Sequence, residues 1–375
     1  MIPGFPSSRF LQGEMMRRCS GAVSVALAGL LALGGPALAA PVPEPLDRPA
    51  TLVRQPDRAA FQAVTAAGGR LVAVGERGLI VLSDDKGASW RQAKVPVSVT
   101  LTAVSFPTPT LGWAVGHYGV VLHSRDGGES WVRQLDGLAA ARIVADSVPK
   151  DGSSPRLGRI VEEGPDKPFL DLFFPTKDAG FIVGAFGLAL RTDDGGKSWS
   201  SLTLDLPNPD GLHLYAIRAG GDALYIAGEQ GLLMRSDDGG RSFRRLSTPY
   251  RGSWFTLAAD ASGGVALAGL RGNAFRSADR GESWQPIELP GPVSVTASGR
   301  APAVNGAPDR LLLANQAGQI LATQEGGGVS LSVSPLPLPP LPMPTGLLAA
   351  GDGSLVVATL RGLWRVPASG ASAAP

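Results

Sequence analysis

A short motif with an acidic side chain recurs along most of the 375-residue chain. Residues 83–90 read SDDKGASW, residues 124–131 read SRDGGESW, and residues 192–199, 236–243 and 277–284 repeat the pattern S/T-x-D-x-G-x-x-W/F. A carboxylate among glycines could ligate calcium, but an EF-hand loop also needs a late bidentate glutamate, which this spacing does not supply. The hydroxyl and the carboxylate can instead accept backbone N–H groups within a tight turn. We therefore expect a structural role for Asp85, Trp90, Asp126, Trp131, Asp194, Trp199, Asp238, Phe243, Asp279 and Trp284.

The other residues that could do chemistry form no catalytic set. His117, His123 and His213 do not have the spacing of metal ligands, so we predict no metal and no cofactor. Glycoside hydrolysis needs two carboxyl groups about 5–10 Å apart. Glu76 and Glu229 occupy equivalent places in the first and fourth repeats, nearly opposite each other in a ring, which is too far apart. No G-x-S-x-G motif marks a nucleophilic serine. We predict no catalytic residue.

A second signal precedes each acidic box and defines the elements that position it. Gly75–Gly78 reads GERG, follows the apolar run Leu71–Val74 and precedes Leu79–Leu82, which predicts a β-hairpin with a two-residue, glycine-flanked loop. Equivalent loops end at glycines 78, 119, 187, 231, 272, 318 and 362, in steps of 41, 68, 44, 41, 46 and 44 residues. A period of about 40–45 residues with four short strands is typical of a propeller blade. We predict an all-β, seven-bladed β-propeller of four-stranded antiparallel blades over residues 51–367.

Two irregularities qualify this repeat. The 68-residue step marks an insertion at residues 135–168, between the second and third blades, in which residues 138–148 and 156–163 have helix-compatible composition. The seventh repeat ends near Val366 without an outer strand. Residues 51–55 resemble the outer strand of the second repeat, so we expect them to complete the last blade and close the ring, which would remove exposed strand edges.

The first forty residues have the features of an export signal. Arg17 and Arg18 precede the apolar stretch Gly21–Leu33 and a small-residue cleavage site, which predicts a signal peptide over residues 1–39 that begins at Met16. Cys19 lies ahead of the apolar stretch, where it is badly placed for lipidation. The prediction is a soluble protein of the periplasm, or of the lumenal side in a photosynthetic host. A linker over residues 40–50 and a disordered tail over residues 368–375 complete the organisation.

The charge of the chain excludes one class of partner. The sequence has 34 Lys and Arg against 32 Asp and Glu. Residues 1–39 hold three arginines and one glutamate, so the remainder carries 31 charges of each sign. Such a neutral protein lacks the basic footprint of a nucleic-acid binder. We expect a monomer that binds no nucleic acid.

The dipeptides between the flanking glycines vary from repeat to repeat. They combine arginines and aromatic residues on loops that a rigid scaffold holds, which favours recognition of a protein or peptide. Each could instead be an ordinary hairpin tip. The predicted partner-binding residues are Arg77, His117, Tyr118, Phe186, Arg271 and Arg361.

These motifs resemble two groups of propellers. The boxes resemble the BNR or Asp-box repeats of sialidases. The fuller unit, Gly112–Gly119 leading into Asp126–Trp131, is similar to the photosystem II stability/assembly factor propeller family, as is Gly164–Leu170 leading into Gly180–Gly184. Similar exported propellers occur in bacteria that are not photosynthetic.

The second resemblance implies a non-catalytic, exported propeller that binds a membrane or envelope protein as an assembly, stability or accessory factor. Its partner would be a photosystem subunit in a photosynthetic host and otherwise an RND-type transporter. The sialidase resemblance implies the alternative, a glycan-binding or glycoside-hydrolysing protein. The chain has no Arg-Ile-Pro-like signature, and no Tyr-Glu pair or arginine triad of that group can be assigned.

Overall fold

The computed structural model describes residues 44–148, 165–260, 262–301, 309–323 and 331–367. The chain divides into two units, Met1–Val42 and Pro43–Pro375, and the described residues lie in the second unit. The predicted signal peptide with Cys19, the helix-compatible stretch 156–163 and the predicted tail 368–375 lie outside the described residues.

Short antiparallel strands form most of the regular structure. The first four sheets along the chain have four strands each. Their strands are β1 (Phe61–Ala67), β2 (Arg70–Gly75), β3 (Ile80–Ser83) and β4 (Arg91–Gln92); β5 (Leu101–Ser105), β6 (Gly112–Gly116), β7 (Val121–Ser124) and β8 (Val132–Leu135); β9 (Phe169–Phe173), β10 (Gly180–Gly184), β11 (Ala189–Thr192) and β12 (Ser200–Ser201); β13 (Leu214–Gly220), β14 (Ala223–Gly228), β15 (Leu233–Ser236) and β16 (Arg244–Arg245).

The C-terminal sheets depart from this plan in two ways. Two further four-stranded sets join into one eight-stranded sheet because β20 and β24 pair in parallel, and the last sheet has three strands. Their strands are β17 (Trp254–Ala259), β18 (Val265–Gly269), β19 (Ala274–Ser277), β20 (Gln285–Glu288), β21 (Val295–Ala301), β22 (Arg310–Asn315), β23 (Ile320–Thr323), β24 (Leu331–Pro335), β25 (Pro344–Ala349), β26 (Leu355–Thr359) and β27 (Gly362–Val366).

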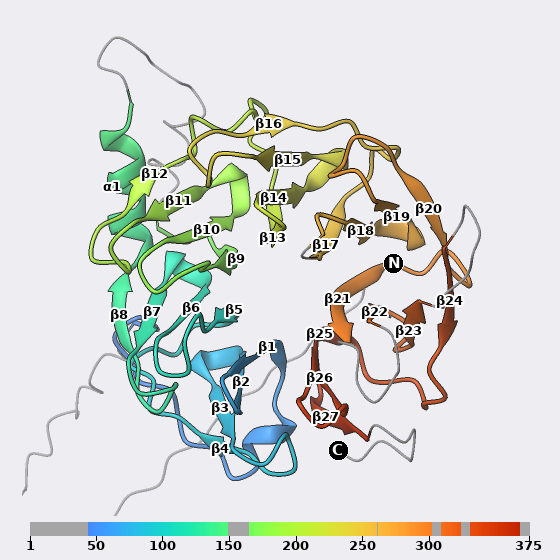
Figure 1. Cartoon of the computed structure of the whole chain (residues 1–375). Helices are drawn as coiled ribbons and strands as arrows, with labels where there is room; N and C mark the ends of the chain where they lie inside the picture. Colours follow the sequence, from blue (N-terminus) through green and yellow to red (C-terminus); the bar gives the residue numbers. More distant parts are fainter. Residues whose placement is uncertain (1–43, 149–164, 261, 302–308, 324–330, 368–375) are drawn as a thin grey trace, which may run out of the picture. The chain divides into compact units, whose positions relative to one another are not determined.

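The first strand of each set lies innermost, and the sets follow one another around a common centre (Figure 1). Each innermost strand contacts the innermost strand of the next set, and β25 contacts β1. Threonine hydroxyls reinforce these contacts. Thr102 donates to the carbonyl of Phe169 at 2.7 Å, and Thr345 donates to that of Phe61 at 2.9 Å, which ties the last sheet to the first. This is the all-β, propeller-like architecture that the repeats predict.

The prediction that residues 51–55 form a closing strand of the last sheet is wrong. These residues form no strand, and the last sheet contains only β25, β26 and β27. The segment lies instead along the first sheet, where the Val53 N–H donates to Gln92 Oε1 at 3.0 Å and Gln92 Nε2 donates to the Thr51 carbonyl at 2.9 Å. Pro56 then opens a short 3-10 turn, Pro56–Arg58, and has no N–H to give to a strand ladder.

A helix lies in the described part of the predicted insertion. α1 (Gly137–Asp146) begins after Asp136, whose side chain accepts the N–H of Ala139 at 3.1 Å and so caps the helix. Ala140 and Val144 are buried and join the apolar cluster between the second and third sheets.

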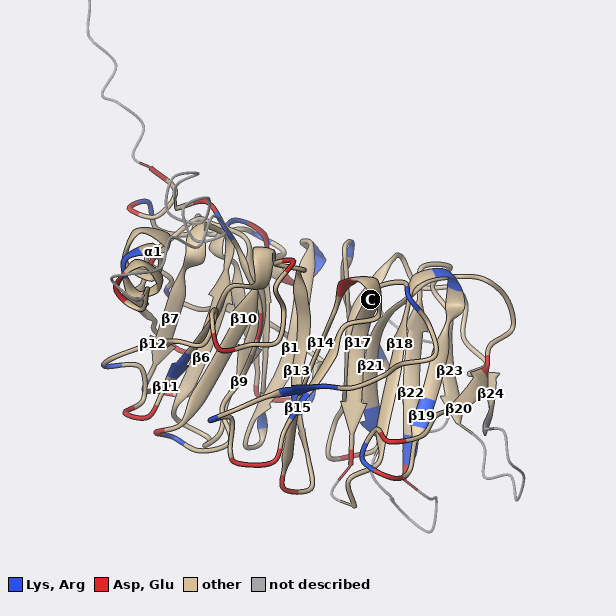
Figure 2. Cartoon of the chain, turned by 90° about the horizontal axis from the view of Figure 1, so that it is seen from above, with Lys and Arg blue, Asp and Glu red and all other residues tan. Residues whose placement is uncertain are grey.

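The apolar core lies between neighbouring sheets. One cluster combines Val72 and Ile80 of the first sheet with Leu101, Leu122 and Trp131 of the second. Figure 2 shows that most Lys, Arg, Asp and Glu residues lie in the loops at the two edges of the sheets, whereas the strands carry few. Burial of both sheet faces explains the near-continuous apolar runs that the sequence shows in its middle strands.

The acidic boxes form a repeated hydrogen-bonded turn. In the second sheet the Ser124 hydroxyl donates to Asp126 Oδ1 at 2.8 Å and accepts the Gly128 N–H at 2.8 Å. Asp126 also accepts the N–H of Ser130 at 3.0 Å and its hydroxyl at 2.5 Å. The same four bonds occur in the boxes that contain Asp85, Asp194, Asp238 and Asp279.

These bonds favour the ionised carboxylates. The hydroxyl four residues further on is the largest cause, and it helps to lower the pKa of Asp85, Asp194 and Asp279 to about 2. Each box therefore uses a charged aspartate to hold its turn.

We predict that Asp126→Ala lowers the free energy of unfolding by about 1–2 kcal/mol, because several hydrogen bonds to a charged acceptor are lost. Urea unfolding followed by circular dichroism measures the change. The matched control is Asp210→Ala, at an exposed loop aspartate outside the boxes, which should change stability by less than about 0.5 kcal/mol. Equal losses at the two positions would contradict a structural role for the box.

Acid should destabilise the fold through the same carboxylates. Their pKa values are lower in the folded chain, at about 2 for Asp85 and Asp279, than the ordinary value near 3.8. The stability that they contribute is therefore complete above about pH 4 and is lost as the pH falls through about 2. Urea midpoints should fall as the pH is lowered across this range. The fall should be smaller in Asp85→Asn than in the unsubstituted chain, and in Asp210→Asn it should be as large as in the unsubstituted chain.

Candidate functional site

The turn between the second and third strands of each set is the element that carries the predicted binding residues. Five of these turns are 3-10 turns, and in each the N–H of the first residue donates to the carbonyl that precedes the innermost strand of the same sheet, as Glu76 does to Ala60 at 3.1 Å. The turns of the last two repeats, which lack the first of the two glycines, make the same bond. The N–H of Gln316 donates to the Ser294 carbonyl at 2.9 Å, and the N–H of Leu360 donates to the Met343 carbonyl at 3.3 Å. This bond places every turn at the same edge of its sheet. The five 3-10 turns are η2 (Glu76–Gly78), η3 (His117–Gly119), η4 (Ala185–Gly187), η5 (Glu229–Gly231) and η6 (Leu270–Gly272).

The second residue of each 3-10 turn has a left-handed backbone. The φ angles are 54° at Arg77, 57° at Tyr118, 57° at Phe186, 50° at Gln230 and 57° at Arg271. This conformation costs a residue with a Cβ roughly 1–2 kcal/mol, and glycine would avoid the cost. Backbone strain of this kind is often found where a side chain has a function.

The predicted binding residues occupy these turns. Arg77, Tyr118, Phe186 and Arg271 take the left-handed position, His117 takes the first position of its turn, and Arg361 follows Leu360 in the last turn. Tyr118 is 38% exposed and Phe186 is 44% exposed. The six residues lie in five separate turns at equivalent edges and do not form one cluster.

Phe186 begins a row of aromatic side chains that crosses three sheets. Its ring lies edge-to-face with His213, with centroids 4.8 Å apart, and its backbone N–H donates to His213 Nδ1 at 3.0 Å. His213 is followed by Tyr215 at 6.3 Å and by Phe255 at 5.6 Å from Tyr215. The Lys167 ammonium lies 5.8 Å from the centroid of the Phe186 ring. The row therefore starts at an exposed turn and runs inward.

Glu229 fixes the middle of this row. Its Oε2 accepts the backbone N–H of His213 at 2.8 Å, and its Oε1 accepts the Tyr215 hydroxyl at 3.2 Å. Burial, together with the Glu229 charge and this hydrogen bond, raises the pKa of Tyr215 to about 12. Tyr215 is therefore a neutral hydrogen-bond donor at any physiological pH.

The sequence analysis did not find this row. His213, Tyr215 and Phe255 stand immediately before or early in innermost strands, and their contacts cross from one sheet to the next. The alternation of His213 and Tyr215 at the start of a strand is the signal that could have placed both on one face.

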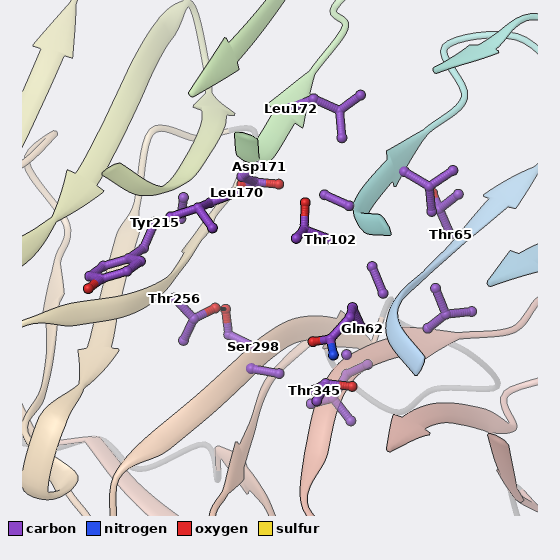
Figure 3. Close-up of a pocket in the computed structure, with 18 of the residues that line it drawn as sticks. Gln62, Thr65, Thr102, Leu170, Asp171, Leu172, Tyr215, Thr256, Ser298 and Thr345 are labelled. Carbon is purple, nitrogen blue, oxygen red and sulfur yellow. Dashed lines mark hydrogen bonds between the residues drawn. The ribbon is translucent and has the colours of Figure 1, made fainter. Parts of the chain in front are cut away.

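A cavity of about 380 Å³ lies among the innermost strands. Hydroxyl and amide groups line much of it, and Figure 3 shows Gln62, Thr102, Thr256, Ser298 and Thr345 around it together with Tyr215. The Thr256 and Ser298 hydroxyls are 2.7 Å apart and bond to each other.

Of the described residues that line the cavity, only Asp171 is acidic. It accepts the Ile217 N–H at 2.9 Å and forms an ion pair with Arg218. Burial raises the pKa of Asp171, and the Arg218 charge opposes that rise. A glycosidase needs two carboxyl groups across its sugar site, and this lining supplies one that is already bonded.

A smaller cavity of about 170 Å³ adjoins the last two turns. Met343 and Leu360 line it beside Gln62 and Thr345, which also line the larger cavity. Met343 is 52% exposed and has a φ of 52°. Met343 precedes the innermost strand β25 and stands outside the glycine-flanked loops, so the loop pattern does not indicate it.

Within the described ranges, no group of three or more His, Cys, Asp or Glu side chains is placed to hold a metal ion. No helix in the described part of the chain has the length and apolar character needed to cross a membrane.

Comparison with protein families gives one match over most of the chain. Residues 55–149 and 158–327 match the family model described as photosynthesis system II assembly factor YCF48. The chain is 34% identical over 151 residues to the photosystem II assembly lipoprotein Ycf48 of Synechococcus sp. (strain CC9902), a match that covers 40% of this chain and 45% of that protein. It is 40% identical over 145 residues to a Ycf48 lipoprotein of Prochlorococcus marinus, covering 38% of this chain and 42% of that one. The matches thus span less than half the length of these curated relatives.

Solved structures show the same fold at low identity. A structure of YCF48 bound to D1 peptide superposes with a TM-score of 0.59 and 18% identity, covering 83% of this chain and 94% of the other. YCF48 from Cyanidioschyzon merolae gives 0.57 and 14%, covering 84% and 97%. An ancestral GH74 enzyme gives 0.62 and 14%, covering 83% and 45%. At these identities the likeness establishes the propeller-like fold alone.

We predict that Tyr118→Gly is more stable than Tyr118→Ala by about 1 kcal/mol, because both variants lose the exposed ring and only glycine relieves the left-handed backbone. Urea unfolding measures the difference. The matched control is Val132, an exposed residue of the outer strand β8, where glycine should be less stable than alanine. If alanine were the more stable substitution at position 118 as well as at position 132, the turn would carry no strain.

Proposed function

The chain belongs to the photosynthesis system II assembly factor YCF48 family, and from this premise we propose that it is a non-catalytic factor that binds a segment of a membrane or envelope protein through the turns described above. The observation that carries the proposal is the pair of exposed aromatic side chains, Tyr118 and Phe186, on left-handed turns where glycine would be less strained. Large aromatic residues dominate the binding energy of many protein interfaces.

The turns suit a peptide segment because they stand on a rigid base. Backbone bonds to the start of the innermost strands hold each turn, so little further ordering accompanies binding. Arg77, Arg271 and Arg361 add donors for carboxylate or carbonyl groups of the segment at three other turns. His117 extends the same surface beside Tyr118.

The relatives guide the choice of partner. One of the solved YCF48 structures holds a D1 peptide. We propose a photosystem subunit as the partner in a photosynthetic host and an RND-type transporter elsewhere. The proposal includes export by the signal peptide at residues 1–39 and a monomeric propeller of seven blades over residues 51–367, in which the contact of β25 with β1 closes the ring.

Glycan binding or glycoside hydrolysis is the alternative function. The aromatic row could stack against a sugar ring, but the single carboxylate of the cavity, Asp171, is paired with Arg218. Crosslinking from the turns separates the two functions.

We predict that photocrosslinkers placed at positions 118 and 186 of the full chain capture one membrane protein in the cell envelope, identified by mass spectrometry. A crosslinker at position 132, exposed on an outer strand and remote from the turns in its sheet, is the matched control and should not capture it. Capture of nothing from any position, with binding on a glycan array, would reject the proposal in favour of the alternative.

Phe186→Ala should weaken capture of that protein from position 118 at least about tenfold, as expected for an aromatic anchor worth about 1.4 kcal/mol or more. Its thermal unfolding midpoint should remain within about 2 °C of the unsubstituted protein, because the ring is half-exposed. Val132→Ala serves as the control and should leave capture unchanged. A loss of capture that tracks a loss of stability would contradict a binding role for Phe186.

A further inference from the structure

Two turns are anchored by a side chain from the next set of strands. The N–H of Phe186 donates to Nδ1 of His213 at 3.0 Å, and the N–H of Arg271 donates to Oγ of Ser294 at 3.1 Å. His213 immediately precedes the innermost strand β13, and Ser294 immediately precedes the innermost strand β21. The two anchors are therefore equivalent in the repeat. One acceptor is an imidazole nitrogen, which can take up a proton, and the other is a hydroxyl oxygen.

The proton of the neutral His213 ring is fixed by this bond. Since Nδ1 accepts the Phe186 N–H, its lone pair is free of a proton and the single ring proton is on Nε2. A second proton can enter only at Nδ1. It converts Nδ1 into a donor, which then faces the Phe186 N–H with no lone pair to accept it.

A second acceptor for the protonated ring is already in place. Oε2 of Glu229 lies 3.6 Å from His213 Nδ1, and 31% of the histidine side chain is exposed to solvent. A small rotation of the ring would let a protonated Nδ1 donate to Glu229. The ring thus has two bonding states: one holds Phe186, and the other holds Glu229.

We propose that His213 is a positioning residue that holds Phe186 in its binding conformation only while the imidazole is neutral, so that protonation breaks this anchor of Phe186 and weakens partner binding. The effect on binding rests on the proposed function, because Phe186 is there a partner-binding residue. The loss of the anchor rests on the hydrogen bonds alone.

The surrounding charged and titratable groups are consistent with a switch at His213. Glu229 faces the ring from η5, and Tyr215 on β13 donates to Glu229 and stays neutral, with its pKa raised to about 12 chiefly by burial. Lys167 lies at the Phe186 ring, with Asp166 3.9 Å from its ammonium. Of these neighbours, Glu229 is the group within reach of Nδ1.

The test follows the two anchored amides in the full chain by NMR hydrogen exchange, corrected for the intrinsic effect of pH. Between about pH 7.5 and about pH 5.5, the range in which imidazoles titrate, the protection of the Phe186 amide should fall at least about fivefold. The Arg271 amide, anchored by Ser294, is the internal control and should keep its protection. Constant protection of Phe186 across this range would overturn the proposal.

His213→Asn separates positioning from a general structural role. The Asn side-chain oxygen can take the place of Nδ1 as acceptor and cannot be protonated in this range. It should therefore keep Phe186 protected at both pH values, whereas His213→Ala should leave it unprotected at both. A pH response that persists in His213→Asn would overturn the proposal.

The binding arm measures crosslinking yield from position 118 into the envelope fraction at the same two pH values. The yield should fall at the lower pH in the unsubstituted chain and stay constant in His213→Asn. An equal fall in both chains would overturn the control of binding by His213. Absence of capture at both pH values, with Phe186 still responding in the amide experiment, would overturn the proposed function and leave the anchor itself supported.

Discussion

One backbone hydrogen bond, repeated in every set of strands, governs the geometry of the candidate site. It joins the first residue of the turn to the carbonyl before the innermost strand, as in the bond from His117 to Thr100 at 2.9 Å. The strand register then skips one residue: Leu101 pairs with Gly116 and Ala103 pairs with Val115, which leaves Thr102 unpaired at the bulge. The skipped residue lines the cavity, and the turn beside it points its second side chain outward. The cavity and the exposed turns are thus two consequences of one local constraint.

The two glycines of each of the five 3-10 turns serve this constraint for different reasons. A Cβ on Gly75 would lie 2.1 Å from the Ala60 carbonyl oxygen, and one on Gly116 would lie 2.2 Å from that of Thr100, so the first glycine permits the close approach that the hydrogen bond needs. The last glycine, such as Gly78 with a φ of 74°, permits a left-handed backbone. Between them the second turn residue is also left-handed but is not glycine. Its side chain differs from one turn to the next.

The repeats made the fold predictable from the sequence. The places where the chain departs from the repeat were not predictable in the same way. Strand order and turn positions follow from the spacing of glycines and apolar runs. The role of residues 51–55 did not follow, because similarity to an outer strand could not show that Gln92 offers hydrogen bonds on the first sheet and that Pro56 ends the segment. For the site, Phe186 was found because it stands in a repeated loop. Its partner His213 was missed because their contact joins two sheets, and only the packing of the sheets sets such distances.

The second positions of the 3-10 turns carry side chains of different chemistry on the same backbone conformation. Arg77 and Arg271 present guanidinium groups, and Tyr118 and Phe186 present rings, all at φ angles between 54° and 57°. The backbone conformation is the same in each of these turns, so it does not account for the difference between their side chains. The aromatic pair falls in the second and third sets, which flank α1, while the arginines fall in the first and fifth. In the order of the sets, the arginines therefore lie on either side of the aromatic pair. A segment that crossed these turns would meet rings between charged donors, which would favour apolar side chains flanked by carboxylate or carbonyl groups, because a carboxylate placed against the rings would lose its partner.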